Sequence, residues 1–175
     1  MSPEHREIIE QIHWQFLEAG ADIIETNTFN SQSVSLADYG MDDLGYELSK
    51  AGAECAKRAV AQVVAAQPTR RCFVAGAIGP TTKTSSVSTD SNDAAARGTT
   101  YPELVQAYGE QVRGLLDGGV DLLLVETIFD TLNAKAAFFA IQRLFAEGAR
   151  QVPIMASVTF IQAGSNRGFS GQTVE

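Results

Sequence analysis

The chain has 175 residues, 45% of them hydrophobic and 19% charged, and its 21 acidic and 13 basic side chains give a formal net charge of −8. This length can bury one hydrophobic core, so we expect one domain over residues 1–175 and no second domain. The acidic balance argues against a nucleic-acid surface, which needs a basic stripe. A membrane span needs a run of about 18 apolar residues, which the sequence lacks, and its start has no signal-peptide pattern. We therefore expect a soluble, cytoplasmic protein.

The first predicted elements are a helix and a strand. Ser2 as N-cap and Pro3 in the first turn favour a helix start, and Gly20 favours its end. A buried strand is expected over 21–29. The apolar residues of the helix share one face at helical spacing: Ile8, Ile9, Ile12 and Phe16.

The middle of the chain continues the alternation. Apolar spacing predicts a helix over 43–64, and an apolar run predicts a short strand over 72–78. The segment 81–100 is rich in Ser, Thr, Asp and Asn, and is long for a connection in a compact domain. We expect it to be a functional loop or a disordered one.

Two further helices and two strands complete the pattern. Thr100 and Glu103 have the spacing of a capping box at a helix start. Strands are expected over 120–128 and 152–160, and Asp130 is expected to cap the helix between them. The inner face of that helix is predicted to hold Leu132, Ala136, Phe139, Ala140 and Leu144.

Apolar strands that alternate with amphipathic helices indicate an α/β fold with a parallel sheet. A doubly wound sheet predicts a G-x-G-x-x-G turn, and neither that motif nor a P-loop occurs. A (β/α)8 barrel predicts polar residues at the ends of strands, where its active sites lie. The sequence has polar residues at all four predicted ends: Glu25 to Thr28, Gly79 to Thr82, Glu126 with Thr127, and Ser157 with Thr159. Part of a barrel is therefore favoured.

Glu126 is the most informative candidate residue. Period-two alternation places it on the same face of its strand as Leu122 and Leu124, where a carboxylate is costly unless it is paired. A ligand-binding carboxylate suited to an ammonium group and a structural ion pair both explain it. Glu25 and Asn27 lie in the same relation to their own strand, and the residues alone favour a structural role for Asn27.

Neither cysteine is predicted to be a nucleophile or a metal ligand. Cys55 lies on the apolar face of its helix, and Cys72 opens a strand at the end opposite the expected site. His5 and His13 lie on the first helix and are expected to be surface or packing residues. We therefore assign no catalytic residue and no metal ligand in this chain.

Four segments resemble the homocysteine-binding domain of the cobalamin-dependent methionine synthases, in the homocysteine S-methyltransferase family. They are EAGADIIETNTFN at 18–30, VAGAIGPT at 74–81, DLLLVETIFDTLNAKAA at 121–137 and SGQT at 170–173. The resemblance covers nearly the whole chain in order. The segment 81–92 is more similar to the cobalamin-dependent branch than to the rest of the family.

The resemblance implies a partial (β/α)8 TIM barrel with about strands two to five of eight. It implies a methyltransferase that moves a methyl group from methylcobalamin, ultimately methyltetrahydrofolate, to zinc-activated homocysteine, giving methionine. Glu126 would bind the substrate ammonium, and Asn27, Thr127 and Gly79 would shape the pocket. Folate, cobalamin and activation modules would be the partners in the full-length protein.

The sequence also departs from the family. The zinc ligands of the family lie in GLNC-like and GGCC-like motifs, which are absent, and Cys55 and Cys72 do not match them. We therefore expect this fragment to be inactive alone, with zinc and cobalamin belonging to the full-length enzyme. Two alternatives stay open: a cobalamin-independent methyltransferase that uses betaine or S-methylmethionine, and a non-catalytic half-barrel module. Its open edges would favour self-association.

Overall fold

The computed structural model of the chain describes residues 3–160, 164, 166–168 and 171–173. The main helices are α1 (Pro3–Glu18), α3 (Gly45–Ala66), α4 (Tyr101–Asp117) and α5 (Thr131–Ala146). Short helical turns follow the first strand: α2 (Ser33–Leu36), η1 (Ala37–Tyr39) and η2 (Asp42–Leu44). The strands are β1 (Ile23–Glu25), β2 (Phe73–Ile78), β3 (Ser88–Asp90), β4 (Asp93–Arg97), β5 (Leu122–Ile128) and β6 (Ile154–Val158).

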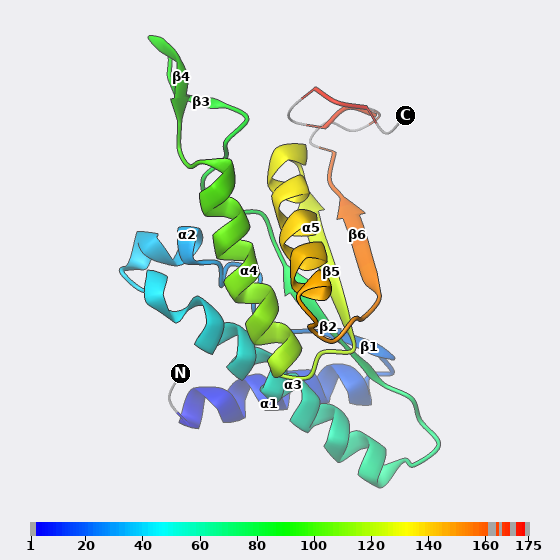
Figure 1. Cartoon of the computed structure of the whole chain (residues 1–175). Coiled ribbons are helices and arrows are strands. Elements are labelled where there is room, and N and C mark those ends of the chain that lie inside the picture. The colour runs from blue at the N-terminus through cyan, green and yellow to red at the C-terminus, as the bar shows by residue number, and fades with distance from the viewer. Residues whose placement is uncertain (1–2, 161–163, 165, 169–170, 174–175) are drawn as a thin grey trace.

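Four strands form one parallel sheet in the order β1-β2-β5-β6. The first three of these strands, β1, β2 and β5, are each followed in the chain by at least one helix and then by the next strand of the sheet, which is the winding of a (β/α)8 barrel. The sheet is open, because β1 and β6 are each paired on one side only among the described residues (Figure 1). The predicted fold class, α/β with part of a TIM barrel, is confirmed.

The four main helices lie against one face of this sheet, each packed on the next along the chain (Figure 1). The main core fills the space between the helices and the sheet, where Tyr108, Leu115 and Leu123 are almost wholly buried. On the opposite face, Ala75, Leu122 and Leu124 form a separate small cluster. None of the described helices is both long and apolar enough to cross a membrane.

The first helix ends as predicted, because Gly20 has a φ of 107° after the last turn. The face predicted to be apolar is exposed, however: Ile8 is 54%, Ile12 42% and Phe16 63% exposed. The helix packs on α3, and Leu17 is the residue it buries completely. The exposed face lies beside the edge strand β1. The Ser2 cap lies outside the described residues.

The segment 81–100 is neither a plain loop nor disordered. It contains the antiparallel hairpin β3–β4, which projects beyond the end of α4 (Figure 1). Turn chemistry explains the hairpin, since Asp90 Oδ1 accepts from the Asn92 N–H at 2.8 Å and Ser88 Oγ donates to the carbonyls of Asp90 and Asp93. The prediction missed this hairpin because its strands lack apolar alternation.

The two predicted helix N-caps that fall on described residues, Thr100 and Asp130, are confirmed. The Thr100 N–H donates to Glu103 Oε2 at 2.7 Å and Thr100 Oγ1 accepts from the Glu103 N–H, which completes the capping box of α4. Asp130 Oδ1 accepts from the N–H groups of Leu132 and Asn133 at the start of α5. The prediction for the inner face of α5 is wrong at Phe139, which is 53% exposed and contacts the Tyr101 ring instead.

Candidate functional site

Glu126 lies near the carboxyl end of β5, on the face of the sheet away from the helices. Leu123 and Val125 belong to the helix-side core, whereas Leu122 and Leu124 belong to the cluster on the other face. By the same alternation Glu126 projects from that second face, which is the inner face in a closed barrel. The carboxylate thus lies on the same face of the sheet as the apolar cluster of Ala75, Leu122 and Leu124.

The backbone changes course directly after this residue. The register between β5 and β6 shifts between Val125 and Ile128, so one extra residue is accommodated on β5. Thr127 has a φ of 53°, and it is the one non-glycine residue with a positive φ in the described chain. A β-branched residue in the left-handed region is strained, and bulges of this kind redirect side chains at functional sites. The geometry at Glu126 is therefore imposed by the surrounding structure.

The electrostatics around Glu126 favour a cation. Burial raises the pKa of the Glu126 carboxyl, and the charge of Glu25 raises it further. Neither carboxylate forms an ion pair with a lysine or arginine among the described residues. A positively charged ligand at Glu126 would offset both the cost of burying this carboxylate and the repulsion from Glu25, so the arrangement suits an ammonium group.

The segment after β1 uses alternate side chains in two ways. Thr26 Oγ1 accepts from the Ala77 N–H at 2.9 Å, and Thr28 Oγ1 donates to the Ala77 carbonyl at 2.8 Å. These hydroxyls replace the backbone ladder beyond Glu25, which explains why β1 is shorter than the predicted strand over 21–29. Asn27 lies between the two threonines and is exposed, on the side opposite their buried hydroxyls.

Gly79 lies at the end of β2 in a position that admits no side chain. A Cβ there would approach the Phe29 ring to 2.7 Å. Its carbonyl accepts from Gln32 Nε2 at 2.7 Å and from the Tyr108 hydroxyl at 3.3 Å. Gly79 therefore joins the loop after β1 to the loop after β2 through its backbone.

The predicted site residues fall into two groups. Gly79 and Glu126 line the same small cavity, about 10 Å³ in volume, together with Tyr108 and Asn133. Glu25 and Asn27 instead line an open groove of about 500 Å³ between β1 and α1. The two groups are connected by the electrostatic effect of Glu25 on Glu126.

Sequence reasoning missed the buried amides that hold these loops. Gln32 and Gln111 are 0% exposed and Asn133 is 1% exposed. Gln111 Nε2 donates to the Thr28 carbonyl at 2.7 Å from the middle of α4. The available signal was an amide at a position that helical periodicity assigns to a buried face, such as Gln111 between Ala107 and Leu115.

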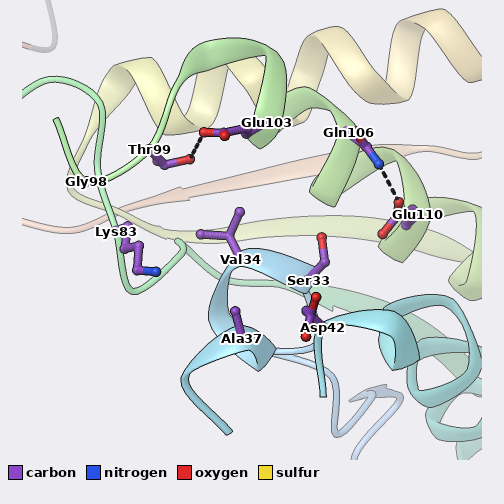
Figure 2. A pocket seen from close by; sticks show the side chains of 10 residues that line it. All are labelled: Ser33, Val34, Ala37, Asp42, Lys83, Gly98, Thr99, Glu103, Gln106 and Glu110. Atoms are coloured by element: carbon purple, nitrogen blue, oxygen red, sulfur yellow. Dashed lines mark hydrogen bonds between the residues drawn. The ribbon is translucent and has the colours of Figure 1, made fainter. Parts of the chain in front are cut away.

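A second cavity of about 360 Å³ lies on the helix side, between α2, the loop after β2 and α4 (Figure 2). Two of its three carboxylates already have partners. Glu103 accepts from the capping N–H of Thr100 and from the Thr99 hydroxyl, which lower its pKa, and Glu110 accepts from Gln106 (Figure 2). This cavity is a polar hollow on the surface, and none of the predicted strand-end site residues lines it.

The two cysteines do not fit a three-thiolate zinc site. Cys55 is buried on α3, where it accepts from the Arg58 guanidinium and burial raises its pKa. Cys72 is buried at the amino end of β2, opposite the Glu126 end. Within the described ranges, no three His, Cys, Asp or Glu side chains gather in a way that could hold a metal ion. The described residues therefore do not by themselves supply a metal site at the ends of these strands.

Three crystal structures of the homocysteine methyltransferase MmuM from Escherichia coli share this fold. The metallated form matches with a TM-score of 0.74 at 23% identity, over 98% of this chain and 57% of that chain. The oxidized form matches with 0.71 at 24% identity over 97% and 56%, and the apo form with 0.68 at 22% over 98% and 55%. This chain thus spans a little over half the length of MmuM. A sequence model described as Homocysteine S-methyltransferase matches residues 1–175, so the chain belongs to the homocysteine S-methyltransferase family.

Proposed function

We propose that residues 1–175 form one partial barrel domain of a methyltransferase and supply part of its homocysteine pocket. Glu126 carries the proposal, because a half-buried carboxylate whose pKa the charge of Glu25 raises further, with no cationic partner among the described side chains, suits the ammonium of an amino acid. Family membership supports homocysteine as that amino acid.

The other predicted residues have supporting roles in this proposal. Thr127 fixes the direction of Glu126 through its left-handed backbone. Gly79 leaves room for the Phe29 ring and closes the pocket from the end of β2. Asn27 is exposed in the segment after β1, which is separated from β5 by β2, and would offer an amide to the ligand from there.

The proposed reaction is S-methylation. The sulfur of homocysteine forms a bond to a methyl carbon, and the bond between that carbon and its carrier breaks, with its electron pair leaving on the carrier. We propose methylcobalamin, supplied from methyltetrahydrofolate, as the donor. The similarity of residues 81–92 to the cobalamin-dependent branch supports this choice over betaine or S-methylmethionine. Zinc, held by ligands outside the described residues, would activate the thiol. Folate, cobalamin and activation modules would be the partners of this domain in the full-length protein.

Calorimetric titration of the purified chain tests the pocket. Homocysteine should bind more tightly than 4-mercaptobutyrate, which lacks the amino group. A hydrogen bond to a charged group contributes about 1.5–3 kcal/mol, so Glu126→Gln should reduce this preference by about 10- to 100-fold. Glu147→Gln is the matched control, because Glu147 is an exposed carboxylate that pairs with Arg143 on α5.

Two results would contradict the proposal. The first is equal affinity of the wild-type chain for homocysteine and 4-mercaptobutyrate, and the second is an unchanged preference in Glu126→Gln. A separate assay with homocysteine and each of the three methyl donors should yield no methionine from this chain alone. Methionine formation would contradict the expected inactivity of the fragment.

A further inference from the structure

Three hydrogen bonds join the loop after β2 to the start of α5. Asn133 Nδ2 donates to Thr81 Oγ1 at 2.7 Å, across 52 residues of sequence, and to the Lys83 carbonyl at 3.4 Å. Ser86 Oγ donates to the second carboxylate oxygen of Asp130, whose first oxygen caps α5. Thr81, Asp130 and Asn133 are each at most 3% exposed. These buried contacts fix the two loops relative to each other.

A further contact reaches the same loop from α4. The Tyr108 hydroxyl donates to the Gly79 carbonyl and lies within reach of the Asn133 amide and Thr81. Burial raises the pKa of Tyr108 to about 12, so the phenol stays protonated over the physiological range. Asn133, Thr81, Tyr108 and Gly79 thus form one polar network on the helix side of the sheet.

This network lies directly behind the candidate site. The ladder between β2 and β5 ends at the pair Ile78 and Val125, immediately before Gly79 and Glu126. Beyond that pair the two backbones separate, and the Asn133–Thr81 bond joins them again on the far side. The backbone at Glu126 therefore lies between the end of the strand ladder and this side-chain contact.

The backbone at Thr127 needs such support. Its φ of 53° is unfavourable for a β-branched residue, and strained backbone persists only where surrounding contacts determine it. Asn133 and Glu126 line the same 10 Å³ cavity. A shift of the loop after β2 would therefore also displace the backbone at Glu126, where the bulge begins. The loop after β2 is therefore one of the surroundings that keep the Thr127 backbone in its conformation.

We propose that Asn133 is a positioning residue, which aligns Glu126 for its ligand by holding Thr81 and the loop after β2 against the turn after β5. This inference rests on the proposed function, because it assigns Asn133 a role at the same site. In this role Asn133 acts through the loop that it holds and not through a contact with the ligand.

A double substitution separates positioning from stability. Asn133→Leu alone leaves the buried Thr81 hydroxyl with one partner fewer and should lower the Tm. Adding Thr81→Val removes both polar groups, so the Tm should recover in part. The double variant should still lose at least tenfold of the preference for homocysteine over 4-mercaptobutyrate, because the Asn133–Thr81 contact beside Glu126 is missing even though the Ser86–Asp130 hydrogen bond remains.

Asp121→Asn is the matched control at the opposite end of the sheet. Asp121 pairs with Lys57 at 2.9 Å and accepts from the Val74 N–H at 2.7 Å. This variant should lower the Tm while the ligand preference stays unchanged. That result would show that destabilisation of the fold by itself does not remove the ligand preference.

Nuclear magnetic resonance of the free protein gives a readout without ligand. The carboxyl carbon of Glu126 should titrate closer to an ordinary glutamate in Asn133→Leu/Thr81→Val than in the wild type, because the side chain is no longer held in place. The inference is overturned if the double variant keeps both the wild-type titration and the wild-type preference. A wild-type chain that shows no preference for homocysteine contradicts the proposed function instead, and the titration still tests Asn133.

Discussion

The same dipeptide, Glu-Thr, ends two strands of this sheet with different results. After β1, Glu25 is exposed and Thr26 continues the extended backbone with its hydroxyl bonded to β2. At the end of β5, Glu126 is half-buried and Thr127 turns into the left-handed region. The dipeptide is the same in both places, whereas its flanking residues and its place in the sheet differ. Strand β5 has neighbours on both sides, whereas β1 is an edge among the described strands.

This comparison explains why the Glu126 carboxylate is half-buried and the Glu25 carboxylate is exposed. A central strand buries its side chains between two neighbours, and a bulge against β6 then redirects Glu126. An edge strand leaves its side chains next to an open groove, here the one between β1 and α1. The position of a strand in the barrel thus decides what the same residues can do.

The largest expected effect tests how open the β1 edge is. Leu17 and Phe16 are adjacent on α1, but Leu17 is 0% and Phe16 is 63% exposed. Leu17→Ala should lower the free energy of unfolding by about 3 kcal/mol, and Phe16→Ala should change it by about 0.5 kcal/mol or less. Urea denaturation of the two variants measures both. A large loss for Phe16→Ala would show that the exposed face of α1 is packed in solution.

A second test addresses Thr26. Thr26→Val keeps the shape of the side chain but removes the acceptor for the buried Ala77 N–H. The unsatisfied donor should cost about 2 kcal/mol of unfolding free energy. Thr26→Ser retains the acceptor and should cost less, which makes it the control. Equal losses for the two variants would indicate that packing of the methyl group matters more than the hydrogen bond.

The corresponding change at Thr127 should have the opposite sign. Thr127→Gly relieves the cost of a left-handed, β-branched residue and should raise the free energy of unfolding by up to about 1 kcal/mol. Greater freedom at the bulge should at the same time weaken homocysteine binding. Denaturation and calorimetry on one preparation measure both quantities. Stabilisation without weaker binding would show that the Thr127 conformation has no part in aligning Glu126.

Local chemistry made much of the fold predictable. The capping box at Thr100 and the cap at Asp130 involve residues three positions apart or fewer, and both appear in the structure as expected. The strand order also followed, because alternating strands and helices admit few windings. The hairpin over 88–97 was missed, since its turn depends on side-chain hydrogen bonds rather than on apolar alternation.

The site was predictable only in its outline. Strand-end polarity identified Glu126 and Gly79, which line one cavity. It gave no indication that Glu25 and Glu126 would differ in burial, because that depends on which strand is central. The contacts of Asn133 with Thr81 and of Gln111 with Thr28 span 52 and 83 residues, and no local pattern encodes such distant partners.

The smallest expected effect concerns the pH dependence of stability. Burial and the charge of Glu25 raise the pKa of Glu126 in the folded chain above its ordinary value of 4.5. The folded state therefore binds the proton more tightly than the unfolded state does, so ionisation of Glu126 destabilises the fold. As the pH rises from 4.5 through the raised pKa, the wild type should lose stability relative to Glu126→Gln, and above that pKa the difference should be constant. Glu25→Gln should reduce this difference, because it removes the charge contribution and leaves burial in place. Parallel pH profiles for the wild type and Glu126→Gln would show that the carboxylate is as well solvated as Glu25, and the contrast between the two Glu-Thr pairs would then lie in their backbones alone.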